Sequence, residues 1–417
     1  MKKLYWRPSG ISRAELFLIA LIALVSLIAV ENLPRVRRQA HFAEKVAAAQ
    51  LASSSMLAIK EEKLRRGITI DPEADPLGSG MIGSPVTPVT SNTGHLPAKL
   101  TTTNPNFAAV VVAMLKEAGV SPGDTVAVGV SGSFPALNVA TYAALETLQL
   151  NPIVIASAAS SEWGANDEDY LWLDMEQTLL QKELVRFRSV AASRGGIDDR
   201  GFGIGREGRA LLDAAIERAQ LVKIEPQTLQ EAIDARMNLY FEKARDERIA
   251  AYINVGGGSA SVGTHVGKKA FTPGLNTTLP RGATDSVMTR FVQEGIPVVH
   301  LSGVGAMAQR YGLPEAFHVP QRIGVGGVYA RVEYNSWFAG LAVVLILGSM
   351  FAFLRFNVGF GLLDGRQKKR VGQSTGTAKT ASVEPERADA VQTPAQSGET
   401  EPGSGDEAAP TGKSMAG

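Results

Sequence analysis

The sequence predicts an α/β protein, with a three-layer domain built on a mostly parallel sheet and flanked by two transmembrane helices. One observation is a strand–helix–strand pattern from Thr125 to Ser157. Such a βαβ unit implies parallel strands, because the crossover returns the chain to the same edge of the sheet. The other is a pair of uninterrupted apolar segments, one near each end, which are typical of membrane helices. A chain of 417 residues has room for both features.

Composition excludes several classes of site. The formal net charge is only +1, so the sequence shows no electrostatic footprint for nucleic acid, and we predict no nucleic-acid partner. The chain has no cysteine, which excludes disulfides, thiolate zinc sites and cysteine nucleophiles. Acidic and histidine residues follow no known metal-ligand spacing, so we predict neither a metal nor a cofactor.

The first apolar segment, "LFLIALIALVSLIAV", runs from Leu16 to Val30 and follows four basic residues. Its length would also suit the core of a signal peptide. No small-x-small cleavage site follows it, however, because "ENLPRVRRQ" intervenes. We therefore predict an uncleaved anchor over residues 14–31, after a cytoplasmic N-terminus of residues 1–13.

The second apolar segment, "NSWFAGLAVVLILGSMFAFL", predicts a transmembrane helix over residues 335–355, with Trp337 at the interface. Basic residues cluster on its C-terminal side, so both chain ends are predicted in the cytoplasm and residues 31–334 on the other side of the membrane. Arginines also follow the first segment, which leaves the opposite topology open. Residues 356–417 predict a disordered cytoplasmic tail, since they contain almost no large apolar side chain.

Between the spans, residues 32–103 predict a helical stalk and a Pro- and Gly-rich loop, and residues 104–334 predict the extracytoplasmic α/β domain. Apolar runs predict the strands "TVAVGV", "NPIVIAS", "AAYINV" and "GIPVVHL". Pro135 suits the first turn of the helix that joins the first two strands. Residues 160–247 contain two helical patterns and predict a helical insertion.

Small, hydroxyl-rich turns follow three of these strands: "SGSFP", "SAASSEWGAND" and "GGGSASVGTH". Ligands of open α/β sheets bind at the carboxyl edge of the strands, and helix N-termini there attract anions. The predicted ligand-binding residues are Ser131, Gly132, Ser133, Ser160, Ser161, Glu162, Trp163, Asn166, Gly257, Gly258, Ser259 and Ser261. The alternative is that small residues only permit tight turns.

A catalytic alternative rests on the same turns. "GVSGS" departs from the G-x-S-x-G nucleophile elbow because Ser133 stands at its fifth position. Ser131 or Ser133 would be the nucleophile, and His265 or His300 the base. "GIGREG" at residues 203–208 matches a dinucleotide pattern, but no apolar strand precedes it, and we interpret it as a loop.

Three stretches carry a family resemblance: "VAVGVSGSFPALNVATYAALETL", "PIVIASAASSEWGANDEDYLWLDME" and "YINVGGGSASVGTH". They resemble the bacterial poly-gamma-glutamate system protein family over roughly residues 10 to 355. The resemblance implies an accessory role in synthesis or export of the polymer at the cell envelope, with the chain in the inner (cytoplasmic) membrane of a bacterium and its central domain outside. The implied partners are glutamyl chains, the membrane and other export proteins. The resemblance implies no catalytic residue. The polymer is a dense polycarboxylate, which is a suitable ligand for an anion site at the strand-end turns.

Four functions therefore remain open. The first is a membrane-anchored accessory protein that binds carboxylates of poly-γ-glutamate. The second is an extracytoplasmic Ser-dependent amide hydrolase or transferase acting on the polymer, and the third is a non-catalytic scaffold. A cytoplasmic sugar-phosphate isomerase-like domain is the fourth, and it requires the inverted topology.

Overall fold

The computed structural model describes residues 13–263 and 267–356. Residues 22–345 form one compact unit, which contains the α/β domain. A second unit contains residues 1–21 and 346–417, of which the structure describes the first residues of α1 (Arg13–Asn32) and the last residues of α13 (Ser336–Phe356).

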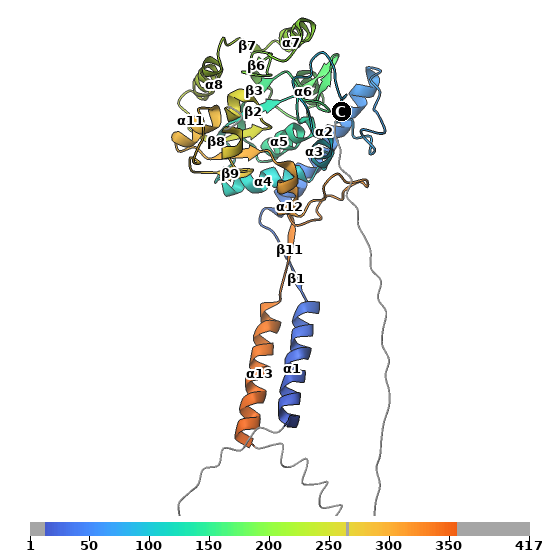
Figure 1. The fold of residues 1–417 in the computed structure, drawn as a ribbon, viewed down its shortest axis with the longest axis vertical. Helices are drawn as coiled ribbons and strands as arrows, with labels where there is room; N and C mark the ends of the chain where they lie inside the picture. Colours follow the sequence, from blue (N-terminus) through green and yellow to red (C-terminus); the bar gives the residue numbers. More distant parts are fainter. Residues whose placement is uncertain (1–12, 264–266, 357–417) are drawn as a thin grey trace, which may run out of the picture. The chain divides into compact units, whose positions relative to one another are not determined.

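A seven-stranded sheet, in the order β7-β6-β3-β2-β8-β10-β9, forms the centre of the domain (Figure 1). Its strands are β2 (Thr125–Ser131), β3 (Asn151–Ser157), β6 (Ser189–Ser193), β7 (Val222–Ile224), β8 (Ile249–Val255), β9 (Gly274–Asn276) and β10 (Val298–Leu301). All neighbours are parallel except β9, which is antiparallel to β10. The predicted α/β class with a mostly parallel sheet is confirmed.

Helices cover both faces of the sheet, because side chains alternate along each buried strand. Val126 and Val128 belong to one apolar cluster, whereas Ala127 between them belongs to the other. The first cluster includes residues of α2 (Phe42–Arg65), α4 (Phe107–Glu117), α5 (Pro135–Thr147), α6 (Trp172–Gln181), α7 (Arg206–Arg218) and α12 (Val304–Tyr311). The second includes α8 (Leu229–Ala244), α9 (Ser259–Val262) and α11 (Val287–Gln293). The sheet thus has apolar helix packing on both sides.

The predicted helical insertion of residues 160–247 requires a correction. This region contains β6 and β7, which extend the main sheet beyond β3, and a small ribbon of β4 (Asn166–Asp167) and β5 (Tyr170–Leu171). The sequence of β6, "SVAAS", is short and consists mostly of Ser and Ala, which have little intrinsic strand preference. Its pairing with β3 therefore reflects tertiary packing, and the region continues the α/β alternation.

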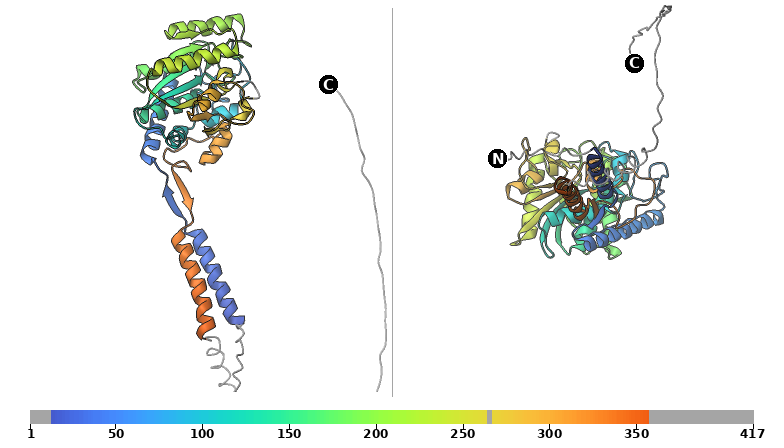
Figure 2. Two further views of the ribbon diagram at one scale, coloured as in Figure 1. Left: turned by 90° about the vertical axis from the view of Figure 1, so that its left-hand side faces the viewer. Right: turned by 90° about the horizontal axis from the view of Figure 1, so that it is seen from below.

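One helix in the described part of the chain is long and apolar enough to cross a membrane, over Ser336–Phe353 within α13. The apolar stretch of α1, Leu16–Asn32, is shorter, so the two-span arrangement remains a prediction. The strand that follows α1, β1 (Arg35–Arg38), pairs antiparallel with β11 (Ala330–Glu333), which precedes α13 (Figure 2). The predicted tail lies outside the described residues from 357 onwards.

Phe291 offers a test of the second apolar cluster. Its ring is fully buried and stacks on Tyr252 with 4.6 Å between ring centroids. We expect Phe291→Ala to lower the free energy of unfolding by about 3–5 kcal/mol, because it leaves a cavity between α11 and β8. Urea unfolding of the full-length chain measures the change. Phe202→Ala is the control, since Phe202 is exposed, and its effect should stay within about 0.5 kcal/mol. Equal effects would contradict this packing.

Candidate functional site

A cavity of about 280 Å³ lies where the turns after β2, β3, β6 and β8 meet. The chain leaves β2 towards β3 on one side, whereas β8 lies on the other side of β2. This reversal of strand order is the place where open α/β sheets form a ligand-binding crevice. All three turns that the sequence predicts as a binding edge contribute residues to the cavity wall.

Half of the predicted ligand-binding residues line this cavity. They are Ser131, Ser133, Ser161, Gly257, Gly258 and Ser259. The others support the turns. Ser160 is fully buried and donates its hydroxyl to the carbonyl of Gly132 at 3.0 Å, and Ser261 shares a hydrogen bond of 3.2 Å with the Tyr252 hydroxyl.

The remaining predicted residues bind the loop of residues 83–94. The fully buried side chain of Asn166 accepts from the N–H of Ser84 at 3.0 Å and donates to its carbonyl at 2.8 Å. Glu162 accepts from the N–H of Gly94, and the carbonyl of Trp163 accepts from the N–H of Gly83. These three residues hold the loop whose residues 91–94 form part of the cavity wall.

The structure describes one of the two predicted histidine bases, His300. His300 is buried on β10, where its Nε2 lies 2.6 Å from the hydroxyl of Ser302 and its Nδ1 lies 3.0 Å from the side chain of Asn254. β8 separates β10 from β2, so His300 does not line the cavity that contains Ser131. His265 lies outside the described residues.

Lys99 is a cavity residue that sequence reasoning missed. It lies on the short helix α3 (Leu96–Thr102) and is only 2% exposed. Its Nζ donates to the carbonyl of Ser133 and, at 2.8 Å, to the hydroxyl of Ser161, and it lies 4.5 Å from the ring centroid of Phe134. Burial lowers the pKa of Lys99 to about 7, although the negative charge of Glu162 opposes the shift.

A buried ion pair closes another side of the cavity. Asp199 lines the cavity and binds Arg236 of α8 at 2.8 Å, and both side chains are almost fully buried. Ser193 donates its hydroxyl to Asp199 at 2.6 Å. Asp198 and Asp199 both adopt left-handed backbone conformations, with φ of 55° and 63°. Such strain in non-glycine residues persists only where the surroundings enforce it, often at functional sites.

The cavity offers hydrogen-bond donors and positive potential to a ligand. Hydroxyls of Ser131, Ser133, Ser161 and Ser259 line it. Helix α5 begins at Pro135, two residues after Ser133, and the unpaired N–H groups of a helix N-terminus favour an anion. Within residues 13–263 and 267–356, no group of three His, Asp or Glu side chains is placed to hold a metal ion.

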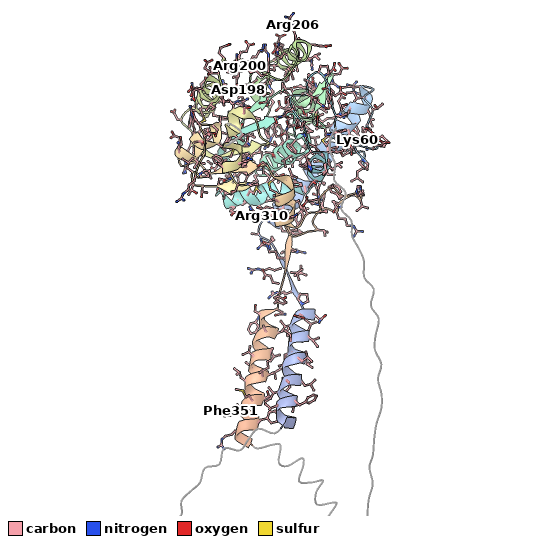
Figure 3. The ribbon with its side chains drawn as sticks, in the orientation of Figure 1. Lys60, Asp198, Arg200, Arg206, Arg310 and Phe351 are labelled. Carbon is pink, nitrogen blue, oxygen red and sulfur yellow. The ribbon has the colours of Figure 1, made fainter. Side chains whose placement is uncertain are left out.

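A basic surface next to the cavity is a second candidate site for an anion. Figure 3 shows Arg200 near Asp198, and Arg206 at the start of α7. A second cavity is lined by Arg194, Arg200 and Arg209. Arg194 is already paired with Asp213 at 2.6 Å, however, so part of this positive charge is neutralised within the chain.

Comparison with models of protein families, with curated proteins and with solved structures finds no match to this chain. The chemistry of the cavity therefore rests on its own geometry.

The buried charge of Lys99 predicts a pH-dependent stability. Its pKa is about 7 in the folded chain and near 10.5 when unfolded, so the cost of burying the charge is fully present below pH 7. That cost disappears as the pH rises from 7 to 10.5, because the unfolded chain then holds a proton that the folded chain lacks. We compare the free energy of unfolding of Lys99→Met with that of the natural chain at each pH. We expect this difference to favour the variant by about 3–5 kcal/mol more at pH 6 than at pH 10.

Urea unfolding across this pH range measures the difference. Lys182→Met is the matched control, since Lys182 is exposed outside the cavity. A difference between Lys99→Met and the natural chain that does not change with pH would show that Lys99 keeps an ordinary pKa.

Proposed function

We propose that this chain is a membrane-anchored accessory component of poly-γ-glutamate synthesis or export, with its α/β domain outside the cytoplasmic membrane. In this proposal, carboxylates of a glutamyl chain bind in the cavity at the strand-end turns. The supporting observation is that turns far apart in sequence converge on one hydroxyl-lined cavity at the reversal of strand order.

The cavity chemistry suits a carboxylate. Ser131 ends β2 and Ser259 follows β8, so serine hydroxyls line the cavity on both sides of the strand reversal. The Ser131 hydroxyl accepts from the N–H of Ser133 at 3.4 Å, and the Ser259 hydroxyl donates to the carbonyl of Gly196 at 3.3 Å, a contact that a bound carboxylate would replace. Hydrogen bonds to an ionised acceptor are shorter and stronger than those between neutral groups. The α5 N-terminus and, when protonated, Lys99 add positive potential. A volume of about 280 Å³ accommodates a short segment rather than a folded partner.

Two features motivate the cellular setting. The resemblance to the poly-gamma-glutamate system protein family, predicted from the sequence, covers the stretches that form β2, β3, β8 and their turns. It stays a prediction, since no family model matches the chain. Helix α13 has the length and composition of a membrane span. A scaffold with no ligand remains the competing function, and it predicts that cavity substitutions leave polymer binding unchanged.

Binding of a short γ-glutamyl oligomer to the full-length chain in detergent tests the proposal by calorimetry. We expect the double variant Ser131→Ala with Ser259→Ala to bind at least about tenfold more weakly, because it removes two donors to charged oxygens. Arg206→Gln is the control, since Arg206 is an exposed cation outside the cavity, and it should bind within about twofold of the natural chain.

Absence of binding by folded natural protein at low salt would remove the proposal. Loss of affinity in Arg206→Gln without loss in the double variant would move the anion site to the basic surface near α7.

A further inference from the structure

Ser161 and Lys99 form a buried pair inside the cavity. The Lys99 Nζ lies 2.8 Å from the Ser161 Oγ, and these residues are 2% and 7% exposed. Both line the cavity, so a ligand can reach them. A serine hydroxyl within hydrogen-bond distance of a base is the arrangement that activates a serine nucleophile.

Ser133 fixes the positions of both partners. Its carbonyl accepts from the Lys99 Nζ, and its hydroxyl accepts from the Ser161 N–H at 3.1 Å. The ring of Phe134 packs against the Lys99 amine on another side. The pair is therefore held in place before any ligand binds, as catalytic groups require.

Burial also makes the protonation state of Lys99 suitable. An exposed lysine is protonated at neutral pH and cannot accept a proton. Because burial lowers the pKa of Lys99 to about 7, a large fraction of the chains carry a neutral amine at that pH. A base whose pKa lies near the working pH is the most effective general base.

We infer that Ser161 and Lys99 are a nucleophile and general base that cleave or transfer amide bonds of a γ-glutamyl chain held in the cavity. The identity of this substrate rests on the proposed function. The pair differs from the serine–histidine arrangement that the sequence suggests, because the base comes from α3 and the nucleophile from the turn after β3.

The reaction balances with water or an amine as the second reactant. Ser161 Oγ attacks the amide carbonyl carbon while its proton moves to the Lys99 Nζ. The C–N bond then breaks, Lys99 returns the proton to the departing nitrogen, and an ester to Ser161 remains. Water attacks this ester to give a carboxylic acid, whereas the amine of a second glutamyl chain gives a new amide. In both cases Lys99 removes a proton from the attacking group and restores the Ser161 hydroxyl.

A fluorophosphonate probe, which bonds to activated serines with loss of fluoride, tests the pair in the full-length protein. We expect one adduct, on Ser161, by peptide mass spectrometry. Its formation rate should rise about tenfold per pH unit below pH 7 and level off above it, as Lys99 loses its proton. This pH profile is measured on the natural chain, so it does not depend on whether a variant folds.

Variants separate the two roles. Ser161→Ala should give no adduct, and Lys99→Met and Lys99→Arg should react at least about 100-fold more slowly, since neither has a titratable base near pH 7. Ser121→Ala and Lys182→Met, both exposed positions outside the cavity, should react at the natural rate. Absence of an adduct on folded protein at pH 8, an adduct on another serine, or an unchanged rate in Lys99→Arg would overturn the inference.

Calorimetry with the γ-glutamyl oligomer distinguishes failure of the Ser161–Lys99 inference from failure of the proposed function. Oligomer binding without an adduct would leave the binding function and remove the catalytic pair. An adduct without oligomer binding would leave the activated serine and remove the glutamyl substrate. With both present, shortening or exchange of the oligomer by the natural chain, absent in Ser161→Ala, completes the expected result.

Discussion

The reversal of strand order between β2 and β8 is the constraint on which the site depends. After β2 the chain enters α5, which packs into the apolar cluster on one face, whereas after β8 it enters α9, which packs into the cluster on the other face. The turns therefore diverge, and the pairing of β2 with β8 ends at Gly129 and Asn254. Serine hydroxyls and the start of α5 occupy this edge, which gives the cavity its donors.

Lys99 gives this edge its chemical character. Burying an amine costs stability unless its charge is compensated, and within the described residues its hydrogen-bond partners are a carbonyl and a hydroxyl. Asp199, which lines the same cavity, adds a left-handed backbone conformation there, as does the adjacent Asp198 in the chain. Departures from the most stable arrangement that gather in one place are typical of functional sites, because selection there favours chemistry over stability.

Much of the central sheet could be predicted from the sequence, because β2, β3, β8 and β10 are apolar runs bounded by turn residues. The meeting of the turns after β2, β3 and β8 follows from the rule that parallel strands share a carboxyl edge. β6 could not be predicted, since its Ser and Ala residues become a strand only through pairing with β3. Lys99 was also hidden, because lysine is ordinarily exposed and its partners Ser133 and Ser161 lie 34 and 62 residues away along the chain.

An experimental structure of the full-length chain with a short γ-glutamyl oligomer tests the central claim most directly. The account predicts ligand carboxylate oxygens within about 2.7–3.2 Å of donors at the end of β2 and in the turn after β8, with Ser131 and Ser259 among them. A ligand bound instead between Arg194, Arg200 and Arg209, or a cavity without ligand at saturating oligomer, would contradict it.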